Sequence, residues 1–254
     1  MKIAVCLKQV PTREWQPRID DSRTGVREQD ASFEMNEPDA YALEEALRLR
    51  EAQGGEVVAC TVGPARAAQV LREALARGAD RAIHVEADGA AKDDPFAVAS
   101  AVADALREEA CDLVLTGLQS DDRGAAQTGV VLAERLGLPH ATIVMDVQVS
   151  NEGVRVKREL EGGWFQWVAL PLPALLTIQS GINQLRYATL KGIMAAKKKE
   201  LRKVAPAALA PARLRIIQLD VPRKTKQTQM ISGSAADAAR ELVRKLKDEA
   251  RVIG

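Results

Sequence analysis

Short apolar runs alternate with amphipathic segments along the first 150 residues of the chain. The apolar runs have the length and composition of buried strands and lie at 3–7, 56–62, 81–85, 111–116 and 141–149. Helical periodicity occupies the segments between them, at 36–53, 65–77, 95–109 and 130–136. Strands that alternate with helices through short loops predict a parallel sheet with right-handed crossovers and helices on both faces.

An irregular excursion follows the first strand, from Pro11 to Met35, and carries a hairpin signal at 20–25. An excursion of this length within a compact domain commonly has a function. The next helix should begin at Asn36, a favoured N-cap residue, with Pro38 in its first turn and Asp39 three residues after the cap.

The pattern changes after residue 150. Segments 153–159 and 164–170 alternate polar and apolar residues like antiparallel strands, with a turn at 161–163, and prolines bound a last apolar strand at 174–178. We expect an antiparallel extension at one edge of the sheet. Its aromatic residues, 164, 165 and 167, should belong to the core or cover the edge.

The segment 183–203 is polar and basic, apart from a few apolar residues before a run of three lysines. This pattern predicts a short helix that docks a partner, although a solvated connector has the same composition. An extended stretch, a basic linker and an amphipathic helix at 234–247 follow. We therefore expect a domain at 1–204, with a partner-recognition loop at about 178–200, and a C-terminal arm at 205–254 that packs on another chain.

Composition and charge narrow the function classes. The chain has 36 basic and 35 acidic residues, a formal charge of +1, and therefore no overall field for nucleic acid or an anionic membrane. The three cysteines lie in apolar runs without CxxC spacing, which favours reduced core residues and no metal site. No apolar run is long enough to span a bilayer, and the first ten residues are typical of a strand. We expect a cytoplasmic protein of a bacterium.

The stretch 117–129, GLQSDDRGAAQTG, is the candidate ligand loop because it joins a strand to a helix. In an open parallel sheet such a loop faces the crevice at the carboxyl ends of the strands. Its glycines allow close approach of the backbone, and the helix start offers amides to an anion. An ordinary turn with a solvated Asp pair remains the alternative. Neither GxGxxG nor GxxxxGK[ST] occurs, so the dinucleotide and P-loop mechanisms lack support.

Separated stretches of the sequence share a further signature. They read KIAVCLKQV at 2–10, MNEPDAYALEEALRLRE at 35–51, VGPARA at 62–67, LREALARGADRAIHVE at 71–86, the loop with its QTG, and LRYATLKGIMAAKKKEL at 185–201. Together they resemble the beta (small) subunit of electron-transfer flavoprotein. The resemblance implies an α/β fold with a doubly wound, mostly parallel sheet, adenine nucleotide alpha-hydrolase-like or Rossmann-like, with an antiparallel edge extension and an extended C-terminal arm.

The resemblance also implies function. It implies a non-enzymatic electron carrier in which this subunit binds AMP structurally, while an alpha subunit holds the redox FAD and receives the C-terminal arm. Expected partners are acyl-CoA or other flavin dehydrogenases and a membrane quinone oxidoreductase. The implied AMP-binding residues are Cys6, Asn36, Glu37, Pro38, Asp39, Val62, Gly117, Gln119, Ser120, Asp121, Asp122, Arg123, Gly124, Ala125, Ala126, Gln127 and Thr128. The implied docking residues are Tyr187, Leu190, Ile193 and Met194, with Leu190 as the anchor.

One alternative lies within the family and two lie outside it. In a bifurcating carrier, a second FAD would occupy the place of AMP. An adenine-nucleotide-binding enzyme of the same fold would need a phosphate-gripping SGGxDS-type loop, and a stand-alone nucleotide sensor would need a glycine-rich loop near the last strand. The sequence contains neither loop. No catalytic residue is expected.

Overall fold

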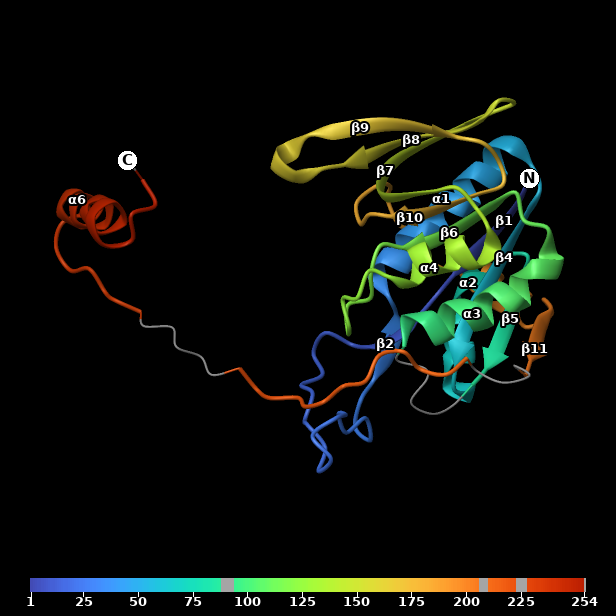
Figure 1. Cartoon of the computed structure of the whole chain (residues 1–254), viewed down its shortest axis with the longest axis horizontal. Coiled ribbons are helices and arrows are strands. Elements are labelled where there is room, and N and C mark those ends of the chain that lie inside the picture. Colours follow the sequence, from blue (N-terminus) through green and yellow to red (C-terminus); the bar gives the residue numbers. More distant parts are fainter. Residues whose placement is uncertain (88–93, 206–209, 223–227, 254) are drawn as a thin grey trace. The chain divides into compact units, whose positions relative to one another are not determined.

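A central sheet with helices on both faces organises residues 1–217 of the computed structural model (Figure 1). The structure describes residues 1–87, 94–205, 210–222 and 228–253. The strands of this sheet are β1 Lys2–Cys6, β4 Glu56–Gly63, β5 Arg81–Glu86, β6 Leu113–Gly117, β7 His140–Ser150, β8 Gly153–Glu159, β9 Phe165–Leu170, β10 Ala174–Ile178 and β11 Leu201–Val204. The helices are α1 Glu37–Gln53, α2 Ala68–Arg77, α3 Pro95–Leu106, α4 Thr128–Leu136, α5 Leu190–Ala196 and α6 Ala235–Arg244.

The strand order is β11-β5-β4-β1-β6-β10-β7-β8-β9. Neighbours from β11 to β7 pair in parallel, and β8 and β9 continue the sheet antiparallel beyond β7. The predicted fold class, a doubly wound and mostly parallel sheet with an antiparallel edge extension, is therefore confirmed. The order reverses at β1, because β4 and β5 lie on one side of it and β6 on the other.

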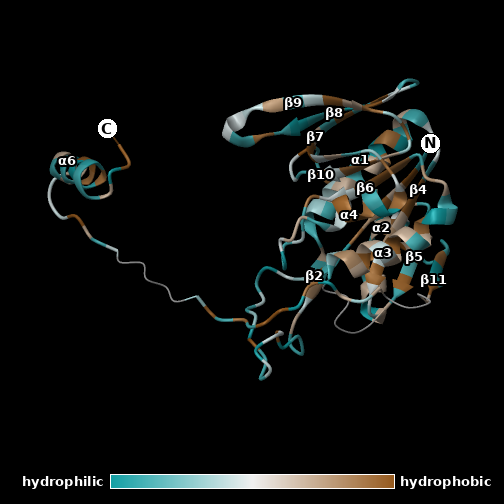
Figure 2. Cartoon of the chain, viewed as in Figure 1, coloured by the Kyte–Doolittle hydropathy of each residue, from teal (hydrophilic) through white to brown (hydrophobic). Residues whose placement is uncertain are grey.

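The core fills the space between the sheet and two helical layers. Alternate residues of each strand point to opposite faces, so Ile3 packs with the α1 and α2 side while Ala4 packs with the α3 and α4 side. Leu43 and Leu71 are fully buried on the first side, and Leu132 on the second. Figure 2 shows the resulting contrast between brown strands and the teal loop after β2.

The excursion after β1 is organised by short antiparallel pairing. Strands β2 (Gln9–Pro11) and β3 (Phe33–Met35) pair at its base, and an isolated bridge joins Ile19 to Val26. The hairpin expected at 20–25 is confirmed, since Asp20 N donates to Gly25 O at 3.0 Å.

The structure adds one strand at a sheet edge and excludes one of the two places expected for the aromatic residues at the other edge. Strand β11 was not expected, because its four residues follow a lysine run and alternate too briefly to give a signal; pairing with β5 defines it. The aromatic residues of the extension are not core residues. Trp164, Phe165 and Trp167 are exposed, and Arg155 and Lys157 lie over the Trp167 and Phe165 rings.

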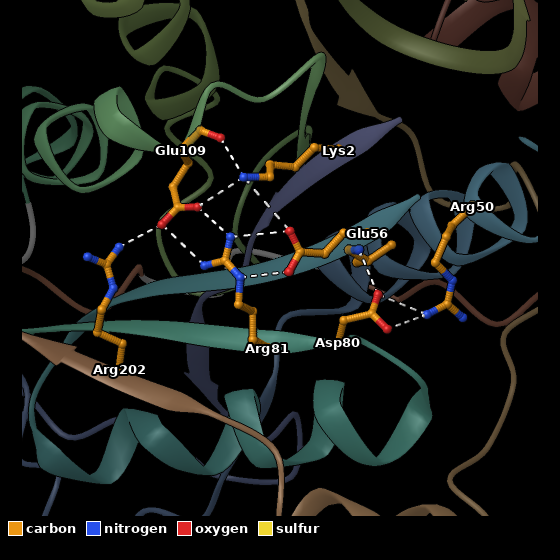
Figure 3. A network of polar contacts seen from close by, with 8 residues as sticks. Lys2, Arg50, Glu56, Asp80, Arg81, Glu109 and Arg202 are labelled. Atoms are coloured by element: carbon orange, nitrogen blue, oxygen red, sulfur yellow. Dashed lines mark hydrogen bonds and ion pairs between the residues drawn. The ribbon is translucent and has the colours of Figure 1, made fainter. Parts of the chain in front are cut away.

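An ionic network joins the amino ends of the strands (Figure 3). Glu109 accepts hydrogen bonds from Arg81 at 2.5 Å and from Arg202 at 2.7 Å, and Arg81 also donates to Glu56 at 2.7 Å. Lys2 lies 3.6 Å from the Glu109 carboxylate. The network ties the edge strand β11 to β5 and β1.

Residues 218–254 form a second unit. Its helix α6 is capped by Ser234, whose hydroxyl accepts the Asp237 N–H, and a turn of π-helix at Lys245–Glu249 follows. The terminal helix expected at 234–247 is thereby confirmed. None of the described residues in this unit is buried. No helix in the described part of the chain is both long and apolar enough to cross a membrane.

Candidate functional site

A pocket opens at the carboxyl ends of β1, β4 and β6, where the strand order reverses. Open α/β sheets place their ligands at such a switch point. The pocket encloses about 850 Å³ of empty space, part of it open to solvent. Its wall consists of Cys6, Leu7, Lys8, Asn36, Asp39, Cys60, Thr61, Val62, Asp94, Pro95, Val98, Val102, Gly117, Leu118, Gln119, Ser120, Arg123, Ala125, Ala126, Gln127, Thr128 and Gly129.

Asn36 joins helix α1 to the 117–129 loop. It stands at the expected N-cap position, yet its side chain makes no cap hydrogen bond. Its Nδ2 instead donates to Gln119 O at 2.9 Å, and its Oδ1 accepts from Asp121 N at 3.0 Å. The side chain is 1% exposed. The amide therefore holds the ligand loop and leaves the first amides of α1 without a side-chain cap.

Asp39 joins the ends of two strands. Its Oδ2 accepts from Lys8 N at 2.7 Å and its Oδ1 from Gly117 N at 3.0 Å. Burial raises the pKa of this carboxyl to about 7, although the two backbone donors and the amide of Asn36 act in the other direction. A Cβ on residue 117 would lie 2.3 Å from Asp39 Oδ1, so only glycine fits there.

Lys8 and Asp122 close the loop from the side of β1. Lys8 Nζ lies 2.7 Å from Asp122 Oδ1 and donates to Ser120 Oγ at 3.2 Å. Burial would raise the pKa of Asp122, but the Lys8 ammonium holds it below its usual range. The loop's second acidic residue is thus committed to an ion pair.

The opposite wall is formed by the start of α4 and by apolar side chains. Helix α4 begins at Thr128, and Gln127 at its cap position makes no side-chain cap hydrogen bond. A Cβ on Gly129 would lie 2.6 Å from Thr177 Cγ2, so glycine allows α4 to approach the sheet. Burial raises the pKa of the Cys60 thiol to about 12, and burial also raises that of Cys6. Both thiols remain protonated and act as apolar wall.

The structure brings most of the expected AMP-binding residues to the pocket wall. These are Cys6, Asn36, Asp39, Val62, Gly117, Gln119, Ser120, Arg123, Ala125, Ala126, Gln127 and Thr128. The remaining five do not line the pocket. Glu37 pairs with Arg13, Pro38 is buried in the first turn of α1, and Asp121 offers its backbone amide to Asn36. Asp122 pairs with Lys8, and Gly124 donates its amide to Ser120 O.

Sequence reasoning missed part of the wall. Lys8 lies two residues after the end of β1, and Thr61 lies two residues before the end of β4. Their positions near the carboxyl ends of neighbouring parallel strands would have indicated them. Asp94 and Pro95 form a cap-and-proline start of α3, which is also visible in the sequence. Val98 and Val102 lie on the wall because α3 packs beside the switch point, and no local signal shows this.

The expected docking residues lie on another part of the chain, residues 183–194, which we call the docking loop. Tyr187 is 88% exposed and Leu190 80% exposed, and Ile193 and Met194 are also exposed. The expected short helix is confirmed as α5, capped by Thr189, whose hydroxyl accepts from Gly192 N at 3.0 Å. Leu190 does not pack inside its own subunit.

Comparison with known proteins gives consistent matches over the whole chain. The model of a family described as "Electron transfer flavoprotein domain" matches residues 24–209. "Electron transfer flavoprotein subunit beta" of Methylophilus methylotrophus is 37% identical over 257 residues, covering 96% of this chain and 97% of that protein.

Two eukaryotic proteins match at similar levels. "Electron transfer flavoprotein subunit beta, mitochondrial" of Oryza sativa subsp. indica is 40% identical over 259 residues and covers 100% of both chains. "Electron transfer flavoprotein subunit beta" of Homo sapiens is 35% identical over 258 residues, covering 99% of each chain.

Proposed function

Because the chain belongs to the electron transfer flavoprotein subunit beta family, we propose that it is the small subunit of a two-subunit electron carrier that binds AMP structurally. In this proposal an alpha subunit carries the redox FAD, and the pair accepts electrons from acyl-CoA or other flavin dehydrogenases. It passes them towards a membrane quinone oxidoreductase. This chain supplies binding surfaces and no catalytic residue.

The observation that carries the proposal is the composition of the pocket at the switch point. Val62, Val98 and Val102 offer an apolar surface suited to an adenine ring. Helix α4 begins at Thr128 on the pocket wall and its cap residue Gln127 makes no side-chain cap hydrogen bond, so the first amides of α4 are suited to bind a phosphate. An apolar surface together with backbone amides at a helix start fits a mononucleotide, which has an apolar base and an anionic phosphate.

The loop is already ordered by its own subunit. Asn36, Asp39 and Lys8 hold Gln119, Gly117 and Asp122 in place without using the pocket's interior. A prearranged wall binds a ligand with little ordering cost. This arrangement supports a tightly held structural nucleotide.

The second unit supports the need for an alpha subunit. Its helix α6 carries apolar residues on one side, and Leu242 and Val243 are exposed. Ile217, Val221 and Met230, in the segments before α6, are also exposed. An arm with this much exposed apolar surface is typical of a segment that packs on another chain. We propose that the arm, residues 205–254, packs on the alpha subunit.

The test is the identity of the released nucleotide. The heterodimer, purified from a host that expresses both subunits, is denatured, and the supernatant is analysed by mass and absorbance. We expect one AMP and one FAD for each heterodimer. Two FAD and no AMP would replace the proposal with the bifurcating type, and absence of any adenine nucleotide besides FAD would refute a nucleotide role for this pocket.

A further inference from the structure

The docking loop is attached to helix α1 by polar contacts. Asn183 Nδ2 donates to Tyr41 O at 3.1 Å and to Glu45 Oε2 at 2.9 Å. Arg48 Nη2 donates to Gln184 O at 3.1 Å. The loop therefore follows the helix whose first turn also builds the nucleotide pocket.

Arg186 makes the densest of these contacts. Its Nε donates to Glu44 Oε2 at 2.7 Å and its Nη2 to Glu44 Oε1 at 3.1 Å. Its Nη1 donates to Glu51 Oε1 at 2.5 Å and its Nη2 to Glu51 Oε2 at 3.1 Å. One planar guanidinium thus bridges two carboxylates that lie about two helical turns apart on α1. We call Arg186, Glu44 and Glu51 the clamp.

The clamp is only partly exposed to water. The Glu44 side chain is 5% exposed and that of Arg186 30%. Burial would raise the pKa of Glu44, but Arg186 and Arg48 hold it below its usual range. Because the carboxylate is largely desolvated, its pairing with Arg186 is screened less than a surface pair would be.

Residues 186–189 contribute no side chain to the core, and the chain rejoins the domain where α5 packs on α2 and buries Ala196. A groove separates residues 184–189 from α1 and α2, and its wall includes Glu44, Glu51, Arg77 and Arg186. Tyr187 and Leu190, which follow the clamp directly, are almost fully exposed. The clamp fixes the chain directly before Tyr187, and the packing of α5 on α2 fixes it after Leu190.

We propose that Arg186 is a positioning residue for partner docking: by bridging Glu44 and Glu51 it holds Tyr187 and Leu190 in a preformed, outward arrangement. The inference rests on the proposed docking role of Leu190. A dehydrogenase that meets a prearranged anchor loses less conformational entropy on binding than one that must order the loop. Arg186 does not touch the partner in this account and acts through Leu190.

The expected effect follows from the cost of ordering side chains. Immobilising one or two long side chains at an interface reduces affinity by about fivefold. Arg186→Gln should therefore raise the KM for an acyl-CoA dehydrogenase by about fivefold, with kcat unchanged. Arg186→Lys keeps the charge but cannot bridge both carboxylates in the same geometry. Its KM should lie between those of Arg186→Gln and the wild type.

The experiment is a double-mutant cycle on the intact heterodimer. Arg186→Gln, Leu190→Ala and the double variant are assayed with an acyl-CoA dehydrogenase that reduces the wild-type complex. The matched control is Arg50→Gln, which removes a partly exposed ion pair of α1, Arg50 with Asp80 at 3.0 Å, that does not involve the docking loop. Reduction by dithionite, which needs no docking, should be the same for every variant. Hydrogen exchange of residues 187–193 should be faster in Arg186→Gln and unchanged in Arg50→Gln.

The outcomes separate the inference from the function on which it rests. If Arg186 acts through Leu190, the double variant has the KM of Leu190→Ala. Additive effects of the two substitutions on KM would overturn the inference about Arg186. It would also be overturned if Arg186→Gln had the wild-type KM and exchange rate while Leu190→Ala had a raised KM. Neither result would affect the proposed docking role of Leu190. A wild-type KM in Leu190→Ala overturns the proposed docking role itself. If Arg186→Gln does not fold, Glu51→Gln removes the exposed half of the clamp and should give a smaller KM increase of the same kind.

Discussion

Replacing Asn36 by Ala should loosen the nucleotide pocket without changing the fold. The substitution removes the hydrogen bonds of 2.9 Å and 3.0 Å that join α1 to Gln119 and Asp121. Each such bond contributes about 1 kcal/mol net to stability. The loop groups stay partly accessible to water, which limits the penalty for leaving them unpaired. We therefore expect the ordered conformation of the loop to be about 2 kcal/mol less stable, which corresponds to about 30-fold weaker AMP binding.

The assay is isothermal titration of AMP into nucleotide-free heterodimer. Asn36→Asp separates the two bonds, because a carboxylate still accepts from Asp121 N but cannot donate to Gln119 O. It should bind AMP more weakly than the wild type. The control is Asn151→Ala, an exposed residue in the turn between β7 and β8, which should change neither AMP affinity nor stability. Hydrogen exchange at the Asp121 amide should accelerate in Asn36→Ala only.

One result would refute this reasoning. If Asn36→Ala binds AMP with wild-type affinity while its free energy of unfolding falls by about 2 kcal/mol, Asn36 stabilises α1 or the core and does not order the pocket.

Two further predictions concern ionisable groups. Burial raises the pKa of Asp39 to about 7 in the folded state, above the value of about 3.9 in an unfolded chain. Between these two pH values the folded state keeps the proton that the unfolded state has lost. The free energy of unfolding should therefore fall as the pH rises from about 3.9 to about 7, by up to about 1.4 kcal/mol per pH unit relative to Asp39→Asn. Urea titrations of both proteins at several pH values measure this, and parallel profiles would contradict it. Glu109→Gln removes the carboxylate shared by Arg81 and Arg202, while Arg81 keeps its pair with Glu56. The free energy of unfolding should fall by about 2 kcal/mol, whereas Glu108→Gln at the exposed neighbour should change it by almost nothing. Nucleotide content should not change, because this network lies at the amino ends of the strands.

The positions of most elements were predictable because they follow from local patterns. The strand at 56–62 and the helix starting at Asn36 appear where periodicity and capping residues indicate them. The loop at 117–129 could be selected as a site because a strand, glycines and a helix start follow one another in the sequence. Exposure of Leu190 was also foreseeable, since its neighbours are polar.

Other features had no local signal. Strand β11 exists because Leu201–Val204 pairs with the open edge of β5. Four residues are too few to give a strand pattern that would predict this pairing. The aromatic residues of β9 have the composition of a core strand, but the sheet ends beside them, so they face solvent. Edge position is a property of the strand order and not of the segment.

The amino-acid sequence by itself determined the alternation of strands and helices, the fold class, the family and the loop that bounds the pocket, since each is encoded in spacing over a few residues or in stretches shared with relatives. Only the tertiary structure decided how the site is held. Asn36 and Asp39 look like helix-capping residues, yet their side chains bind residues 78 to 85 positions away. The reversal of strand order at β1 brings α1 beside the end of β6, and this places the backbone amides of Gly117 and Asp121 within reach of side chains that would otherwise cap the helix.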